Sequence, residues 1–172
     1  MDVLRTVGTA PWILLEGAVV ERLRRDPAVR LDPHVVHAGL VLSAAGRLAL
    51  GRIYEEYLAI GREAGVPLIL LTPTWRSNPE RLRAAGLEDS DVNGKGVRFL
   101  RDLRGACGPY GDRVLILGLM GSRGDAYRPE EGLPAEEAEV FHGAQAEALA
   151  RAGVDGFQAA TQSTLPEPLG LC

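Results

Sequence analysis

The sequence predicts an α/β fold built around a parallel β-sheet. Short apolar segments alternate four times with segments in which charged residues recur at helical spacing, which is the pattern of repeated βα units. The segments 67–71 and 114–117 are apolar at every position, as strands covered on both faces are. The 172 residues are 46% hydrophobic and 24% charged, a composition typical of one globular domain that excludes disorder for most of the chain.

The first βα unit is expected at 12–25. Its apolar start ends at Glu16 and Gly17, and charged residues then recur at helical spacing in 20–25, which indicates a helix. The turn between the two elements therefore carries a carboxylate beside a glycine.

A connection and an ambiguous segment follow the first unit. Two prolines interrupt 26–33, and each removes a backbone donor and restricts the residue before it, so this stretch is predicted as a connection. The apolar residues of 34–42 fit either a strand or a packed loop. His34 and His37 lie there and have no evident acidic partner in the sequence.

The second unit begins with an amphipathic helix. Apolar residues recur at spacings of three and four in 46–64, and Gly65 supplies the stop. The buried strand 67–71 comes next and ends in the polar segment 72–76.

Two helices and a third strand come next. A helix is expected from 79 to 85, with a proline in its first turn, and another around 97–103. Cys107 lies in a glycine-rich turn before the strand 114–117, and the exit from that strand, 118–127, carries three glycines.

The last unit contains the clearest helix, 134–152, with acidic residues near its N-terminus. His142 is expected to be solvated or to cap, as lone helical histidines usually are. The strand 154–160 and the turn 162–168 complete the pattern. The side chains expected to share the helix's apolar stripe are Val140, Phe141, Ala144, Ala148 and Leu149.

Repeated βα units are compatible with two architectures. One is part of a (β/α)8 TIM-type barrel with about four βα units present, and the alternative is a doubly wound, flavodoxin-like sandwich. Both place their chemistry at the C-terminal ends of the strands, so the segments that leave the strands are the candidate site.

Charge and hydropathy exclude several kinds of partner. Nineteen basic against twenty-three acidic residues give a net charge of −4, so nucleic acid is not an expected partner. No apolar run approaches the ~20 residues that span a bilayer, and the N-terminus does not resemble a signal peptide. We therefore expect a cytoplasmic protein with no membrane partner.

The two cysteines, Cys107 and Cys172, predict neither a disulfide framework nor a metal site. The sequence has no C-x-x-C or H-x-x-x-H spacing, and Cys107 precedes its strand, which places it at the rim opposite the candidate site. We expect no metal ligand in this chain.

The strand ends supply the substrate-binding candidates, and none of them is assigned a catalytic role. Glu16 is placed to receive an ammonium group, although it also fits an exposed acid at a helix entry. Thr72 and Thr74 point to one side of an extended segment, and Trp75 fits a substrate wall or simple packing. The candidates are Glu16, Gly17, Thr72, Thr74, Trp75, Met120, Gly121, Asp125 and Tyr127.

Several motifs together resemble the homocysteine S-methyltransferase family, and the resemblance extends over nearly the whole chain. Their order and spacing are more specific than any one of them. They are Leu14-Leu15-Glu16-Gly17-Ala18, Thr72-Pro73-Thr74-Trp75, Gly118-Leu119-Met120-Gly121, Tyr127-Arg128-Pro129, Phe141-His142 with Gln145-Ala146-Glu147, and Ala152-Gly153-Val154-Asp155.

The resemblance implies a (β/α)8 barrel that transfers a methyl group to the thiol of homocysteine and forms methionine. It implies a zinc ion held by three cysteines after the sixth and eighth strands, so those ligands are not in this chain. It also implies that Glu16, where the family usually has Asp, and the 72–75 segment hold the amino acid. Ala160 stands where the family often places a glutamate that takes the substrate ammonium.

A (β/α)8 barrel typically needs ~250 residues, so residues 1–172 are expected to be the N-terminal half of such a barrel, truncated after the fourth strand. The expected partners are an amino-acid thiol and a methyl donor, and a C-terminal half or a second copy. By itself the chain is expected to be inactive. The alternative is a non-catalytic half-barrel that binds a small molecule or associates with itself.

Overall fold

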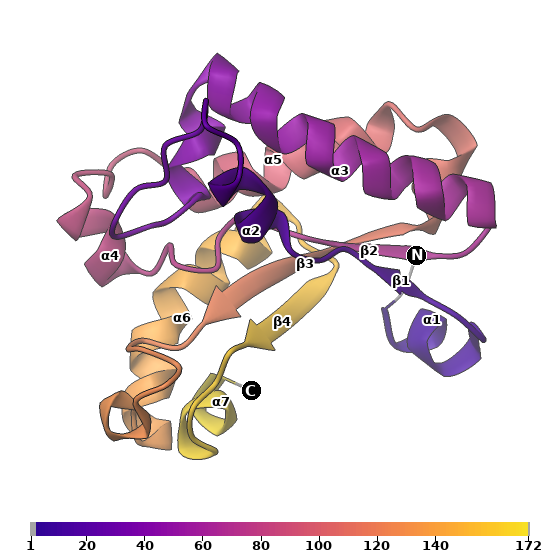
Figure 1. The fold of residues 1–172 in the computed structure, drawn as a ribbon. Helices are drawn as coiled ribbons and strands as arrows, with labels where there is room; N and C mark the ends of the chain where they lie inside the picture. The colour runs from indigo at the N-terminus through magenta and orange to yellow at the C-terminus, as the bar shows by residue number, and fades with distance from the viewer. Residues whose placement is uncertain (1–2, 172) are drawn as a thin grey trace.

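Four parallel strands form one sheet, in a computed structural model that describes residues 3–171. The strands are β1 (Leu14–Leu15), β2 (Leu68–Leu71), β3 (Val114–Gly121) and β4 (Gly156–Ala160). They lie side by side in the order β1-β2-β3-β4, and each pairs in parallel with the next. Figure 1 shows the strands fanning out in one curled layer.

Helices connect the strands and pack against the sheet (Figure 1). The α-helices are α1 (Val3–Thr9), α2 (Val19–Arg24), α3 (Ala44–Ala64), α4 (Pro79–Ala84), α5 (Val92–Gly105), α6 (Ala135–Ala152) and α7 (Pro166–Leu171). Short 3₁₀ helices are η1 (Ala38–Leu42), η2 (Gly108–Arg113) and η3 (Pro129–Glu131). The segment 34–42, whose pattern fitted a strand or a loop, therefore holds η1 rather than a strand.

The strand order decides between the two predicted architectures. A doubly wound sandwich reverses its strand order at a switch point, so that helices cover both faces of the sheet. Here the spatial order equals the chain order, and right-handed crossovers then place every connecting helix on one face and curl the sheet toward the other. The predicted half barrel of four βα units is confirmed, and the flavodoxin-like alternative is wrong.

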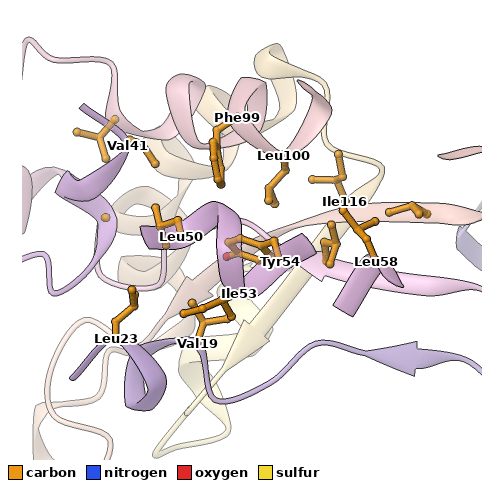
Figure 2. Close-up of a cluster of buried hydrophobic side chains, with 14 of the residues drawn as sticks. Val19, Leu23, Val41, Leu50, Ile53, Tyr54, Leu58, Phe99, Leu100 and Ile116 are labelled. Atoms are coloured by element: carbon orange, nitrogen blue, oxygen red, sulfur yellow. The ribbon is translucent and has the colours of Figure 1, made fainter. Parts of the chain in front are cut away.

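The main hydrophobic core lies between the sheet and helices α3 and α5. Figure 2 shows side chains from α2, α3, α5 and β3 meeting there. The ring of Tyr54 is fully buried and lies 6.0 Å from that of Phe99 in an edge-to-face arrangement. A smaller cluster of Val97, Met120 and Leu149 joins β3 to α5 and α6. Alternate residues of β3 therefore face the helices, and Met120 is one of them.

Local signals set the helix boundaries as expected. The Ser43 side chain accepts a hydrogen bond from Gly46 N–H at the start of α3, and Gly65, at a φ of 64°, ends the helix. Asn78 caps α4 in the same way through the Arg81 N–H. Among the residues that the structure describes, no helix combines the length and the apolar character needed to cross a bilayer.

The fully buried residues of α6 include only Leu149 from the predicted stripe. Val140 is 81% exposed, whereas His142 and Gln145 are buried. His142 Nε2 lies 2.9 Å from Glu167 Oε1 on α7, and Gln145 Nε2 donates to Thr74 O at 2.9 Å. The expectation that His142 is solvated or capping is wrong, because a buried carboxylate 25 residues away is its partner.

Candidate functional site

A pocket of about 250 Å³ opens at the C-terminal ends of the strands, where both predicted architectures place a site. It lies between the segments that leave β1, β2, β3 and β4. Its walls are mostly apolar. Its lining residues are Glu16, Gly17, Ala18, Val19, Val20, Glu21, His37, Tyr54, Leu71, Thr72, Trp75, Leu119, Ala160 and Thr161.

Glu16 follows β1 directly and is buried, with only 6% of its surface exposed. The alternative of an exposed acid at a helix entry is therefore wrong. Burial raises the pKa of Glu16 from 4.5 to about 7, although a hydrogen bond from the Leu71 backbone lowers it in part. Its Oε2 atom has no hydrogen-bond partner among residues 3–171. The pocket thus contains a carboxylate oxygen available to a ligand.

His37 lies in the same pocket, at the start of η1, and sequence reasoning did not select it. Its side chain is buried, and burial lowers its pKa from 6.5 to about 4, so the imidazole is neutral at physiological pH. Because 34–42 shows no periodicity that orients its side chains, no pattern in the sequence could place His37 in the same pocket as Glu16.

Thr72 and Thr74 bridge two strands. Leu119 N–H donates to Thr72 Oγ1 at 2.9 Å, the two hydroxyl oxygens lie 2.6 Å apart, and the Thr74 hydroxyl donates to Leu119 O at 2.8 Å. Both side chains are fully buried, and only Thr72 lines the pocket. These hydroxyls therefore hold the ends of β2 and β3 together.

Trp75 forms one wall of the pocket and is held by three contacts. Its indole N–H donates to Thr161 Oγ1 at 2.9 Å, which joins the end of β2 to the end of β4. The Arg76 guanidinium stacks 4.5 Å from the ring centroid, and Trp75 O accepts a hydrogen bond from Gly121 N–H at 3.0 Å. The indole orientation is therefore fixed before any ligand binds.

The close approach of Trp75 leaves no room for a side chain at position 121, so we expect Gly121→Ala to displace the indole. A Cβ atom there would come within 2.7 Å of Trp75 O and 2.6 Å of Trp75 Nε1. The clash should cost about 1–3 kcal/mol of unfolding free energy and change the Trp75 fluorescence, both measured during urea denaturation. The control is Gly143→Ala on α6, where nothing lies within 4 Å of the added atom. Equal stabilities of the two variants would contradict this assignment.

The remaining predicted residues lie outside the pocket. Met120 packs in the core against the helices. Gly121 donates its backbone N–H to Trp75 O and lies too close to the indole to carry a side chain. Asp125 is exposed and accepts the Tyr127 N–H, and the Tyr127 side chain is 94% exposed. The structure thus brings Glu16, Gly17, Thr72 and Trp75 together in the pocket. Thr74 and Gly121 contact these residues from outside the pocket lining. Met120, Asp125 and Tyr127 do not line it.

Unfavourable backbone conformations gather around the pocket. Ala18 and Thr161 line it with φ values of 53° and 55°, and Val36, directly before His37, has a φ of 57°. Positive φ costs a residue that carries a Cβ atom of order 1–3 kcal/mol, and such residues concentrate at functional sites. This distribution supports the pocket as the functional site.

The fold and the pocket define a protein of the (β/α)-barrel class, with its site at the C-terminal ends of the strands. The model of the family described as homocysteine S-methyltransferase matches residues 13–171. The chain belongs to the homocysteine S-methyltransferase family.

One solved structure supports the fold assignment. The crystal structure of the homocysteine methyltransferase MmuM from Escherichia coli, in an oxidized form, is similar to this chain with a TM-score of 0.81 and 23% sequence identity. The similarity covers 99% of this chain and 60% of that chain, so this chain spans about 60% of the length of the MmuM structure. Comparison of the sequence with curated proteins gives no match.

The zinc ion that the family resemblance implies does not fit the described residues. Residues 3–171 contain no group of three or more His, Cys, Asp or Glu side chains arranged to hold a metal. Cys107 lies before β3, at the strand end opposite the pocket, and its thiol donates to Leu103 O. Cys172 lies outside the described residues. We therefore assign no zinc chemistry to this part of the chain.

Proposed function

We propose that this chain is the substrate-binding part of a homocysteine S-methyltransferase, in which residues 1–172 supply the N-terminal half of the barrel. Family membership and the four βα units support this proposal. The single observation that carries it is Glu16, a buried carboxylate at the C-terminal end of β1 whose Oε2 atom lacks a partner within the described residues. Such an oxygen is suited to the ammonium group of an amino acid.

The residues of this chain would bind and orient the amino acid. Glu16 would be ionised when an ammonium group approaches, because an adjacent positive charge favours the carboxylate over the acid. Trp75 would confine the aliphatic part of the substrate from one side, since its indole is already held by Thr161 and Arg76. A fixed wall reduces the entropy lost on binding.

In the proposed reaction, a lone pair on the homocysteine sulfur forms a bond to the methyl carbon of a donor. For a sulfonium donor, the bond from that carbon to the donor sulfur breaks, and its electron pair stays on the donor as a neutral thioether. The thiol proton is released, and the product is methionine. We propose that the metal and the donor are held by residues outside 1–172.

The proposal is tested by assaying methionine formation with and without a C-terminal barrel half, supplied in trans, that carries the three cysteines. We expect no methionine from the 172-residue chain alone and methionine from the mixture. In the mixture, Glu16→Ala should raise the KM for homocysteine by about tenfold or more, because a hydrogen bond to a charged group is lost. Lys95→Ala, a control on the exposed face of α5, should leave KM unchanged. Equal effects of the two substitutions would remove Glu16 from the site.

The second candidate function is a non-catalytic half-barrel module. The observation that favours it is the open sheet. Within residues 3–171, β1 and β4 each pair with only one strand, and Leu15 and Phe157 on them are 48% and 43% exposed. Such a module would bind the amino acid or a second copy of itself. It would form no methionine in the mixture described above.

A further inference from the structure

Two buried polar atoms in one pocket lack protein partners, and together they point to the chemistry of the ligand. They are Glu16 Oε2 and His37 Nδ1, neither of which has a hydrogen-bond partner within the described part of the chain. Both residues line the pocket at the strand ends, and His37 is only 2% exposed. Leaving a polar atom buried and unpaired costs free energy, so a ligand that satisfies both atoms would recover that cost.

Hydrogen bonds order the backbone of the loop that leads to His37. Asp32 Oδ1 accepts hydrogen bonds from the backbone N–H groups of His34 and Val35, at 2.7 and 2.9 Å. Asp32 and Val36 also exchange two backbone hydrogen bonds, at 2.9 and 3.0 Å, which hold Val36 at a φ of 57°. A β-branched residue seldom adopts this conformation, so the loop accepts strain at the residue that precedes His37.

The other polar groups of the pocket leave it rich in acceptors. The Tyr54 hydroxyl donates to Leu71 O, and the Trp75 indole N–H donates to Thr161, so neither hydrogen is available to a ligand. The described residues that line the pocket include no Lys and no Arg. A neutral imidazole has one nitrogen that accepts a hydrogen bond, and burial keeps the pKa of His37 low enough for it to stay neutral. In the tautomer that carries its proton on Nε2, His37 Nδ1 is an acceptor, and a ligand group that pairs with it and with the ionised Glu16 is then a donor.

We propose that His37 is a specificity-determining residue that accepts a hydrogen bond, through Nδ1, from a ligand's primary ammonium group whose charge Glu16 balances. An ammonium has three donors and no acceptor, so its chemistry matches both unpaired atoms, Glu16 Oε2 and His37 Nδ1. The inference rests on the proposed function, in which this pocket holds an amino acid, and deepens it by assigning recognition of the amino group to two residues.

The experiment measures dissociation constants by calorimetry on the 172-residue chain with two matched probes. Homocysteine and 4-mercaptobutyrate share the thiol and the carboxylate and differ only in the amino group. The wild-type chain should prefer homocysteine by about a hundredfold, since charge-assisted hydrogen bonds are among the strongest. His37→Leu should reduce this preference by about tenfold, the loss of one such bond.

Two further variants separate recognition from structure. His37→Asn places an acceptor oxygen near the position of Nδ1, so it should restore the preference that His37→Leu loses. His34→Leu changes an exposed histidine of the same loop and should leave the preference unchanged. Thermal melts of each variant verify that the chain folds.

The outcomes distinguish this inference from the proposed function. An unchanged preference in His37→Leu, or no preference in the wild type, overturns the role of His37. Methionine formation in the mixture of barrel halves would still support the proposed function in that case. Conversely, a His37-dependent preference without methionine formation would uphold the ammonium site and contradict the methyltransferase.

Discussion

Glu16→Gln is expected to stabilise the chain above neutral pH and to have almost no effect near pH 4.5. Folding raises the pKa of Glu16 from 4.5 to about 7, so the folded state binds this proton more tightly than the unfolded state. The stability that this proton provides is complete below pH 4.5 and is lost as the pH rises through 7. At 1.36 kcal/mol for each pKa unit, the loss at pH 8 is about 3 kcal/mol. Glutamine keeps the shape and avoids the buried charge.

The measurement is the unfolding free energy in urea at pH 5, 6, 7 and 8 for the wild type and the variant. His37 acts in the opposite sense, because its pKa falls from 6.5 to about 4 and its stabilisation is lost as the pH falls through that range. His37 is present in both proteins, so comparing them at each pH removes the part of its contribution that does not depend on Glu16. Glu63→Gln, on the exposed face of α3, is the matched control. Its unfolding free energy should differ from that of the wild type by the same amount at every pH. If the unfolding free energy of Glu16→Gln relative to the wild type does not increase between pH 5 and 8, the raised pKa of Glu16 is contradicted.

Glu167→Ala is expected to destabilise the chain more strongly than Gly121→Ala does. Glu167 is fully buried, and its Oε1 accepts the Arg123 N–H at 2.7 Å and lies 2.9 Å from His142 Nε2. Its Oε2 accepts the Leu133 N–H at 3.4 Å. Alanine would leave these donors buried without an acceptor, at a cost of about 3–5 kcal/mol.

Urea denaturation provides the test, with Glu139→Ala on the exposed face of α6 as the control. The control should change the unfolding free energy by less than about 0.5 kcal/mol. Glu167→Gln retains one acceptor oxygen and should fall between the wild type and Glu167→Ala. A loss below about 1 kcal/mol in Glu167→Ala would show that the cluster is hydrated rather than sealed.

The fold could be predicted because its signals are local. The doubly apolar strands, the glycine stop at Gly65 and the spacing of α3 each depend on residues within one element. The family resemblance then selected the barrel, and the strand order confirmed it. The features that could not be predicted from the sequence depend on contacts between residues far apart in the chain. On the buried face of α6, Leu149 was predicted from the apolar stripe, whereas His142 and Gln145 are buried because their partners are Glu167 and Thr74.

The candidate site could be predicted only in part, for the same reason. Glu16 follows β1 directly and Trp75 lies four residues beyond the end of β2, so the parallel sheet brings both to the same edge. His37 lies in a connection without periodicity, and only the fold of that loop places it in the pocket. Asp125 and Tyr127 belong to a glycine-rich exit segment whose residues are exposed, so strand proximity did not bring them to the site.

The hydrogen bond from Trp75 to Thr161 joins residues 86 positions apart, and this separation affects when the pocket can exist. Synthesis releases the chain from the N-terminus, so Glu16, His37 and Trp75 emerge long before β4 and Thr161, the residue that directly follows it. Contacts of such long range form late in folding, because closing the intervening loop must precede them. Ligand binding would therefore select chains in which all four strands have docked, and the ligand would act as a reporter of completed folding.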